Sequence, residues 1–331
     1  MRRSDKAEAA PSAPRAGRSS HGPVSRKLPK PEIPYILAFE ERVSSLEAQI
    51  NMSRSSPFAD GPEFQRLLRH EARPDLVRIA LEIARDAYPE LRPEPYLAII
   101  DGLAARVRER CAAGAKPRQV LGQINWVLFV EEGFRGNTEE YYDPRNSYLN
   151  EVIDRKTGIP ITLAVLYWTL AERVGLAMAG VNLPAHFLLR VGRGDATIFV
   201  DPFHAGALLD RAGCERRLAE IVGQPVALSE IQLEPCGVDL VVSRMLRNLK
   251  SIYVQQHDYI AALPVQRRLA ALNPNDPAEH RDLGMLCIQV DRSGEAIAAL
   301  QTYLDARPEA GDAETIHALL RAARRELALR N

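Results

Sequence analysis

The sequence predicts an α+β chain whose mixed core is flanked in sequence by helical segments. Three observations support this class. Amphipathic helical patterns fill residues 34–138, short apolar runs separated by Gly, Pro and Asp occupy 139–238, and a helical repeat with an offset of 34 residues fills 239–331. Residues 1–33 are poor in large apolar side chains, so we expect a disordered basic tail there.

Composition limits the classes of function. The 331 residues suffice for two folded domains and a tail, and the formal net charge of zero gives no reason to expect nucleic acid or an acidic membrane as partner. No apolar run approaches the ~18 residues that a membrane helix needs, and the first thirty residues lack the apolar segment of a secretory signal. The cysteines form no CxxC pair, which argues against a structural zinc site or a disulfide framework and indicates a cytoplasmic protein: Cys111, Cys214, Cys236 and Cys287.

Helices are predicted on both sides of the core and at its centre. "PDLVRIALEIARDAY" places apolar side chains at i, i+3, i+4 and i+7 from Leu76 to Ile83, and "PYLAIIDGLAARVRERC" and "PRQVLGQINWVLFVEEGF" continue the pattern. "RKTGIPITLAVLYWTLAERVGL" indicates a sharp turn followed by a helix over 160–174. Trp126 and Trp168 lie within apolar helical patterns, so we expect both in the core.

Short strands follow the central helix in "AMAGVNL", "AHFLLRV", "TIFVD" and "GALLD". Gly192–Asp195 is a strong turn signal, and a turn centred there pairs residues whose numbers sum to 387. His186 then lies opposite Asp201, with Cβ atoms roughly 5 Å apart, close enough for the carboxylate to orient the imidazole. The other face of this hairpin is apolar: Phe187, Leu189, Val191, Ile198 and Val200.

The C-terminal repeat matches the tetratricopeptide (TPR) pattern. Small residues let antiparallel helices approach closely, and a proline ends the second helix of each unit. The expected packing residues are Leu249, Tyr253, Ala262 and Pro274 in the first unit, and Leu283, Gly284, Ala296, Leu300 and Pro308 in the second. Residues 312–329 read as a capping helix with an Arg-rich outer face. A generic pair of helical hairpins is the alternative.

A helix opening, a histidine and an aspartate in this order resemble the transglutaminase-like superfamily, a relative of papain-type proteases. The chain more specifically resembles its bacterial SirB-type branch, which joins a transglutaminase-like core to TPR repeats. The resemblance covers roughly residues 60–310. It rests on "YYDPRNSYLNEVIDRKTGIPITLAVLY" at 141–167, "LPAHFLLR" at 183–190, "VDPFHAG" at 200–206 and "RMLRNLKSIY" at 244–253.

The resemblance implies a papain-like α+β core in which His186 matches the general base and Asp201 its orienting aspartate. The nucleophile's position, two residues after Gly158, falls on Pro160, which has no group able to attack a carbonyl. No cysteine lies in this segment to replace it. Thr157 reads as a turn or cap residue.

Further pocket or binding residues are expected beside this site. Asn146 reads as a turn or cap residue in a loop that the resemblance places beside the pocket, and Thr162 as a first-turn helix residue next to Gly158. His204 could join His186 in a metal site. Asp201 is more simply the partner of its histidine, and no third ligand is apparent. We therefore expect no metal and no cofactor.

Three interpretations of the His186–Asp201 pair remain open: a structural hydrogen-bonded pair, a retained ligand or peptide groove, and a working catalyst in which His186 activates water. The leading functional hypothesis is a non-catalytic protein-interaction or regulatory module that binds a protein partner through its TPR groove. The alternatives are a cysteine-independent hydrolase or transferase, and an assembly factor that uses only its helical surfaces. Whether a small molecule occupies the pocket is left open.

Overall fold

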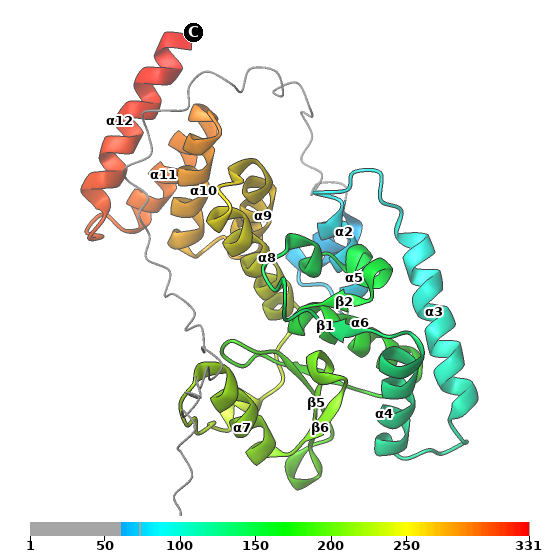
Figure 1. The fold of residues 1–331 in the computed structure, drawn as a ribbon. Coiled ribbons are helices and arrows are strands. Elements are labelled where there is room, and N and C mark those ends of the chain that lie inside the picture. Colours follow the sequence, from blue (N-terminus) through cyan, green and yellow to red (C-terminus); the bar gives the residue numbers. More distant parts are fainter. Residues whose placement is uncertain (1–60, 73, 331) are drawn as a thin grey trace, which may run out of the picture. The chain divides into compact units, whose positions relative to one another are not determined.

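The computed structural model describes residues 61–330 except Arg73 (Figure 1). The predictions for the tail at 1–33 and for residues 34–60 lie outside the described residues. The first helices each begin at a residue suited to a helix start, since Pro opens three of them and Asp75 accepts a hydrogen bond from the Arg78 amide. They are α1 (Pro62–Leu68), α2 (Leu76–Ala84), α3 (Pro93–Arg110), α4 (Pro117–Asn125) and a π-helical segment η2 (Trp126–Glu131).

The core is organised around α6 (Pro160–Arg173), which follows α5 (Leu149–Arg155). Every residue of α6 from Pro160 to Ala171 is buried, as expected for a helix that is apolar on all sides. Helices α2, α3, α4 and α5 all pack against it. A short parallel pair, β1 (Arg135–Gly136) and β2 (Thr157–Gly158), leads the chain into α6, so the predicted central helix is confirmed.

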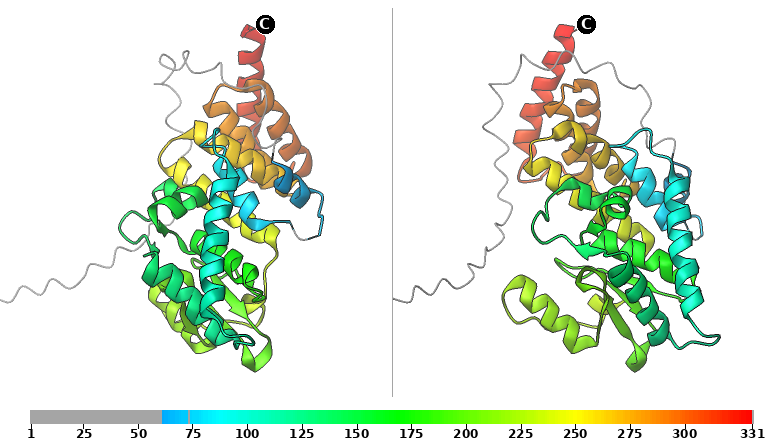
Figure 2. Two further views of the ribbon diagram at one scale, coloured as in Figure 1. Left: turned by 90° about the vertical axis from the view of Figure 1, so that its right-hand side faces the viewer. Right: turned by 45° about the vertical axis from the view of Figure 1, so that its right-hand side comes forward.

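An antiparallel sheet in the order β3-β4-β5-β6 covers α6 on one side (Figures 1 and 2). One face joins the core around α6 through Leu189, Val191 and Val200. The opposite face packs Leu188 and Phe199 against Cys214 and Leu218 of α7. The elements are β3 (Ala179–Val181), β4 (Leu188–Val191), β5 (Ile198–Asp201), β6 (Ala207–Leu209) and α7 (Arg211–Val222), with 3₁₀ turns at η4 (Gly194–Ala196) and η5 (Pro202–His204).

The predicted hairpin register is wrong by two residues. Leu189 pairs with Val200 and Val191 with Ile198, so paired numbers sum to 389 and not to 387. The 3₁₀ turn η4 makes the connection longer than the tight turn that Gly192–Asp195 suggested. His186 accordingly lies outside β4. Because the error is an even number of residues, every side chain keeps its predicted face.

The C-terminal region is a helical repeat, as predicted. Helix α9 (Tyr259–Leu272) and helix α11 (Ser293–Ala306) are 34 residues apart at both ends. The remaining helices are α8 (Val238–Gln255), α10 (Pro277–Gln289) and α12 (Ala313–Arg330). Leu249, Ala262, Ala296 and Leu300 are fully buried, Tyr253 and Gly284 are buried, Leu283 is half-buried, and Pro274 and Pro308 are exposed just after α9 and α11.

Gly284 permits the close approach of α10 and α11, because a Cβ at this position would collide with the Leu300 side chain. The repeats are also joined to the rest of the chain by polar contacts. Arg268 of α9 donates to both carboxylate oxygens of Asp86, at 2.6 and 2.8 Å, and the Tyr253 and Tyr148 hydroxyls lie 2.6 Å apart. Helix α8, which carries Tyr253, belongs to the repeats and also packs against α2 and α6 of the core.

The α+β class is confirmed: the described residues are mostly helical, with small sheets in the core region. The core position of Trp168 is confirmed, whereas the prediction for Trp126 is wrong, because its side chain is 48% exposed and bonds to Glu131 on the same π-helical segment. In residues 61–72 and 74–330, no helix combines the length and apolar character needed to cross a membrane.

Candidate functional site

His186 stands on a tight turn just before β4. Its backbone N–H donates to Leu183 O at 3.3 Å, and Ala185 adopts a positive φ of 58°, an uncommon conformation for a residue other than glycine. The imidazole is only 2% exposed. The turn thus holds the ring in one orientation beside the end of β5.

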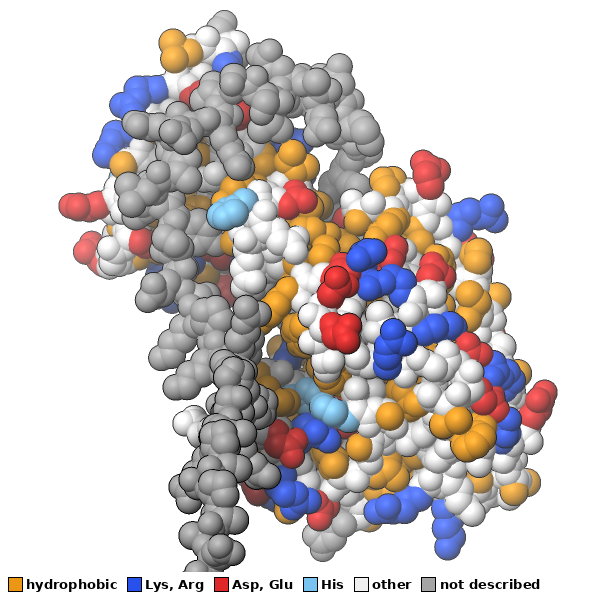
Figure 3. Space-filling view, viewed as in Figure 1, with side chains coloured by type: hydrophobic (Ala, Val, Ile, Leu, Met, Phe, Trp, Pro, Cys, Tyr) orange, Lys and Arg blue, Asp and Glu red, His pale blue; other side chains and the backbone are white. Residues whose placement is uncertain are grey.

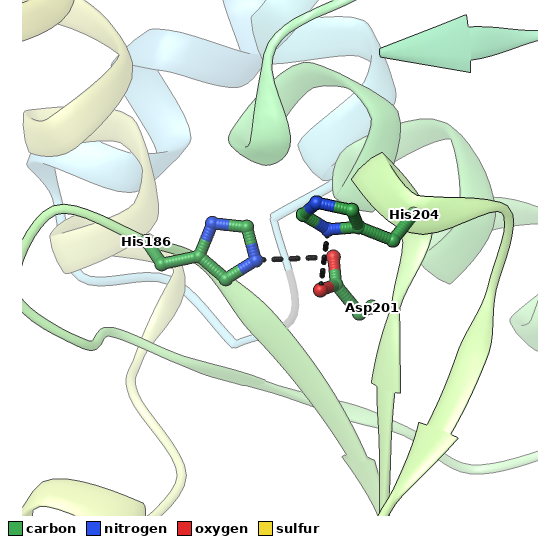
Figure 4. Close-up of side chains that lie close together, drawn as sticks. All are labelled: His186, Asp201 and His204. Carbon is green, nitrogen blue, oxygen red and sulfur yellow. Dashed lines mark hydrogen bonds and ion pairs between the residues drawn. The ribbon is translucent and has the colours of Figure 1, made fainter. Parts of the chain in front are cut away.

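Asp201, the last residue of β5, is fully buried and has three partners, of which Figure 4 shows the two histidines. Its Oδ1 lies 3.0 Å from His186 Nε2, and its Oδ2 lies 2.7 Å from His204 Nδ1 and 3.1 Å from Arg217 Nε on α7. Burial raises the pKa of Asp201, but the hydrogen bonds from the two imidazoles outweigh it and hold the pKa well below its ordinary value. One carboxylate therefore orients both rings and is balanced by one guanidinium.

The turn that carries His204 is fixed from the helical side. Asn125 Nδ2 donates to Gly206 O at 2.8 Å, and Tyr167 of α6 donates to Asn125 Oδ1, also at 2.8 Å. Gly206 has a φ of 71°, and a Cβ there would collide with the Asn125 amide, so the turn requires glycine. The His204 side chain is 36% exposed, which makes it the accessible member of the group.

The opening of α6 contains no reactive group. Pro160 is buried at its first position, and the Thr162 hydroxyl donates to Asn146 O at 2.8 Å while accepting from the Ile159 amide. Asn146 is fully buried, and its side chain donates to Glu140 O and accepts from Asn137. Gly158 is buried against Thr162. The described contacts thus give Asn146 and Thr162 roles in ordering the loop and the helix start; their place in a pocket stays a prediction.

Three of the four cysteines are thiols that stay protonated at neutral pH. Burial raises the pKa of Cys214 and of Cys287 to about 12, and that of Cys236 to about 11. All four cysteines are free thiols, and Cys111, the residue after α3, lines a hollow of ≈ 440 Å³ whose lining shares no residue with the His186 site.

Among the described residues, His186, Asp201 and His204 are the group that could hold a metal ion, with ligand atoms within 4.8 Å of one another. The sequence analysis named His186 and His204 as candidate ligands, and the structure adds Asp201 as the third. His186 Nε2 and His204 Nδ1 already bond to Asp201, and the Arg217 cation lies beside Asp201 Oδ2. These contacts satisfy the Asp201 carboxylate without a metal ion, and the Arg217 cation would repel a further cation.

The sequence did not reveal Arg217, Phe203, Tyr141 or Arg244 as neighbours of this site. The Phe203 ring lies 6.3 Å from the His186 ring and 6.3 Å from the Tyr141 ring, and Arg244 bonds to the turn that carries His186. A signal existed for Arg244, since "RMLRNLKSIY" was one of the motifs that carried the resemblance. Nothing in the sequence pointed to Arg217.

A change of pH tests the charge state of Asp201. Because its native pKa is lowered, its contribution to stability is complete above about pH 4, the unfolded value, and is lost as the pH falls below it. We expect the wild type to exceed Asp201→Asn in free energy of unfolding at neutral pH, and the difference to shrink in acid. Urea denaturation at a series of pH values measures it; a difference that stays constant down to about pH 2 would contradict the assignment.

Comparison with known proteins identifies two families along the chain. A family described as the transglutaminase-like superfamily matches residues 94–247, and a tetratricopeptide repeat family matches 249–321. A His–Asp pair beside a core helix, followed by helical repeats, thus defines a transglutaminase-like protein with a TPR region. The match to residues 94–247 begins within the predicted helical subdomain, so the boundary at 138 stays a prediction.

The chain belongs to the UPF0162 family. It is 34% identical over 245 residues to a UPF0162 protein of Xylella fastidiosa (strain 9a5c), covering 73% of this chain and 87% of that protein. It is also 38% identical over 142 residues to F-box only protein 21 of Mus musculus, covering 40% of this chain and 22% of that protein. A crystal structure of menin aligns over 80% of this chain and 74% of menin, but its TM-score of 0.39 at 12% identity supports no conclusion.

Proposed function

We propose that the chain is a non-catalytic transglutaminase-like protein that acts as a protein-interaction or regulatory module in the cytoplasm. The observation that carries this proposal is Pro160, which stands at the first position of α6, where the superfamily resemblance places the nucleophile. Its ring offers neither a thiol nor a hydroxyl. The His186–Asp201 pair then holds the sheet and the His204 turn together without a covalent step.

The Thr162 hydroxyl and the Cys214 thiol are poor replacements for a nucleophile. The Thr162 hydroxyl is engaged by Asn146 O and Ile159, and burial raises the pKa of the Cys214 thiol, on the apolar face beneath the sheet, to about 12. A hydroxyl so engaged lacks an adjacent base to activate it, and a protonated thiol is a weak nucleophile. Both observations support a binding role.

The repeats are the surface on which we propose that a protein partner binds, because TPR repeats present extended helical surfaces. Their order is maintained by ion pairs between the first helices of neighbouring repeats. Arg247 of α8 pairs with Glu279 of α10 at 2.9 Å, and Lys250 pairs with Asp282 at 2.6 Å. These pairs fix the repeat stack and leave the exposed side chains of α12 available for contact, among them His317 and Arg321.

A second candidate is a cysteine-independent hydrolase or transferase. The observation that favours it is the orientation of His186, whose Nε2 faces Asp201 and whose Nδ1 has no hydrogen-bond partner within the described part of the chain (Figure 4). An imidazole oriented in this way could take a proton from water. It would still act without covalent catalysis.

Incubating the purified chain with a glutamine-containing peptide and a fluorescent primary amine separates the two candidates. We expect neither ammonia release nor amine incorporation from the wild type or from His186→Ala. Turnover by the wild type that His186→Ala abolishes would instead establish the second candidate. For the binding role, a partner captured by the wild type should be lost from His317→Glu/Arg321→Glu and retained by Arg118→Glu, an exposed control on α4. Retention by both variants would argue against binding at α12.

A further inference from the structure

Arg244 is anchored at the turn that carries His186. Its Nη1 donates to Leu183 O and to Asn182 Oδ1, and the same Leu183 carbonyl accepts the backbone N–H of His186. Arg244 lies on α8, so a residue of the first repeat helix is fixed beside the core site. These contacts occupy only one of the three nitrogens of its guanidinium.

The described residues offer no hydrogen-bond partner to the remaining edge of that guanidinium. In this chain, Arg267 and Arg268 each bind a carboxylate through Nε and Nη2, the edge whose parallel N–H groups match two carboxylate oxygens. Within residues 61–330, Arg73 excepted, neither Nε nor Nη2 of Arg244 makes a hydrogen bond, and no carboxylate lies within 4.0 Å of them.

Among the residues that the structure describes, no anion pairs with Arg244, whose side chain is partly buried. Burial lowers its pKa, and its closest ionisable neighbours are Tyr141 and Cys236. Burial raises the pKa of both of these groups, to about 11 for Cys236, so both are neutral at pH 7. Asp201 cannot serve as the counter-ion of Arg244, because its charge is balanced by Arg217. A partly desolvated cation without an anion is costly, and a bound anion would remove that cost.

The surroundings suit an anion carried on an apolar or aromatic stem. The Phe187 ring centroid lies 5.9 Å from Arg244 Cζ. The Tyr141, Phe203 and His186 rings follow one another in edge contacts, which connect Arg244 to the candidate site. The local excess is one positive charge, so a monoanion balances it better than a phosphate dianion does.

We infer that the Nε–Nη2 edge of Arg244 binds the carboxylate of a peptide ligand beside His186. This inference rests on the proposed function, since it names what the core would recognise in a binding module. The carboxylate is the free C-terminus of a chain or an acidic side chain. Arg244 then acts as a binding residue, and the aromatic rings contact the stem of the ligand.

N-acetyl-phenylalanine and its amide are matched probes, observed by ligand NMR with the purified full chain. We expect saturable binding of the acid and at least about tenfold weaker binding of the amide, because the charge-assisted bidentate contact is lost. N-acetyl-glutamic acid α-amide tests an acidic side chain as the source, and inorganic phosphate tests a dianion. The same spectra report hydrolysis of the amide, so turnover, which would defeat the proposed function, is distinguished from lack of binding.

Two variants decide the role of Arg244. Arg244→Gln is expected to weaken binding of the acid about tenfold or more, whereas Arg118→Gln, which removes an exposed arginine on α4, should bind as the wild type does. If Arg244→Gln fails to fold, Arg244→Lys keeps the charge without the planar edge and should weaken binding. Equal binding of acid and amide, tighter binding of phosphate, absence of saturable binding, or wild-type affinity in the Arg244 variants would overturn the inference.

Discussion

Replacing Asp86 with Ala is expected to lower the free energy of unfolding by about 3–5 kcal/mol, because it removes the carboxylate from a buried ion pair and leaves the cation behind. The side chains of Asp86 and Arg268 are 2% and 0% exposed, and two N–H groups of Arg268 bond to this carboxylate. Arg268 also lies over the Phe64 ring at 4.8 Å, where water has little access. Chemical denaturation measures the change.

Asp101→Ala is the matched control. Asp101 pairs with Arg173 at 2.7 Å, but these side chains are 56% and 34% exposed, so the pair contributes less than about 1 kcal/mol. Similar losses for the two variants would mean that the Asp86–Arg268 pair is hydrated in solution. The contact that joins the repeats to α2 would then be weaker than its burial indicates.

Placing a thiol at the opening of α6 tests whether the inherited geometry survives. The Cys introduced by Pro160→Cys is expected to react with iodoacetamide at neutral pH about a hundredfold or more faster than Cys287, because a helix N-terminus and a neighbouring imidazolium lower a thiol pKa. Burial raises the pKa of Cys287 to about 12, so it supplies an internal reference. Mass spectrometry of labelled peptides gives both rates.

The control is the same substitution in a His186→Ala background, where the gain in rate should disappear. A thiol at 160 that reacts no faster than Cys287 would show that His186 does not face the opening of α6 or that the reagent cannot reach it. Neither outcome requires the chain to be an enzyme. The experiment reports the geometry that the superfamily resemblance implies.

Local periodicity made much of the fold predictable. The helical spacing from Leu76 to Ile83 and the continuous apolar run after Pro160 both correspond to buried helices, because side-chain spacing alone decides which face can be buried. The 34-residue offset is reproduced by the ends of α9 and α11. The His186–Asp201 contact was predictable as well, because an error of two residues in the register leaves each side chain on the same face of the hairpin.

Features that depend on tertiary packing were not predictable. The longer turn at η4 follows from the backbone path between β4 and β5, and a glycine-rich sequence fits several turn lengths. Arg217 and Arg244 reach the site from α7 and α8, and nothing in their local sequence states which groups they will meet. The exposure of Trp126 likewise depends on how η2 lies on the core, and the π-helical turn shifts the helical phase there.

The two family patterns meet at residue 248, yet this residue lies in the middle of one uninterrupted helix, α8. The half before it carries Arg244, and the half after it carries Tyr253, which reaches back to Tyr148. A recombination that exchanged the repeats at residue 248 would therefore divide α8. The Arg244 contact and the Tyr253 contact would then come from two different proteins. Grafting this repeat region onto another core would require a junction at Gly237, so that α8 is transferred whole. The side chains by which α8 docks on the core would then stay on one helix.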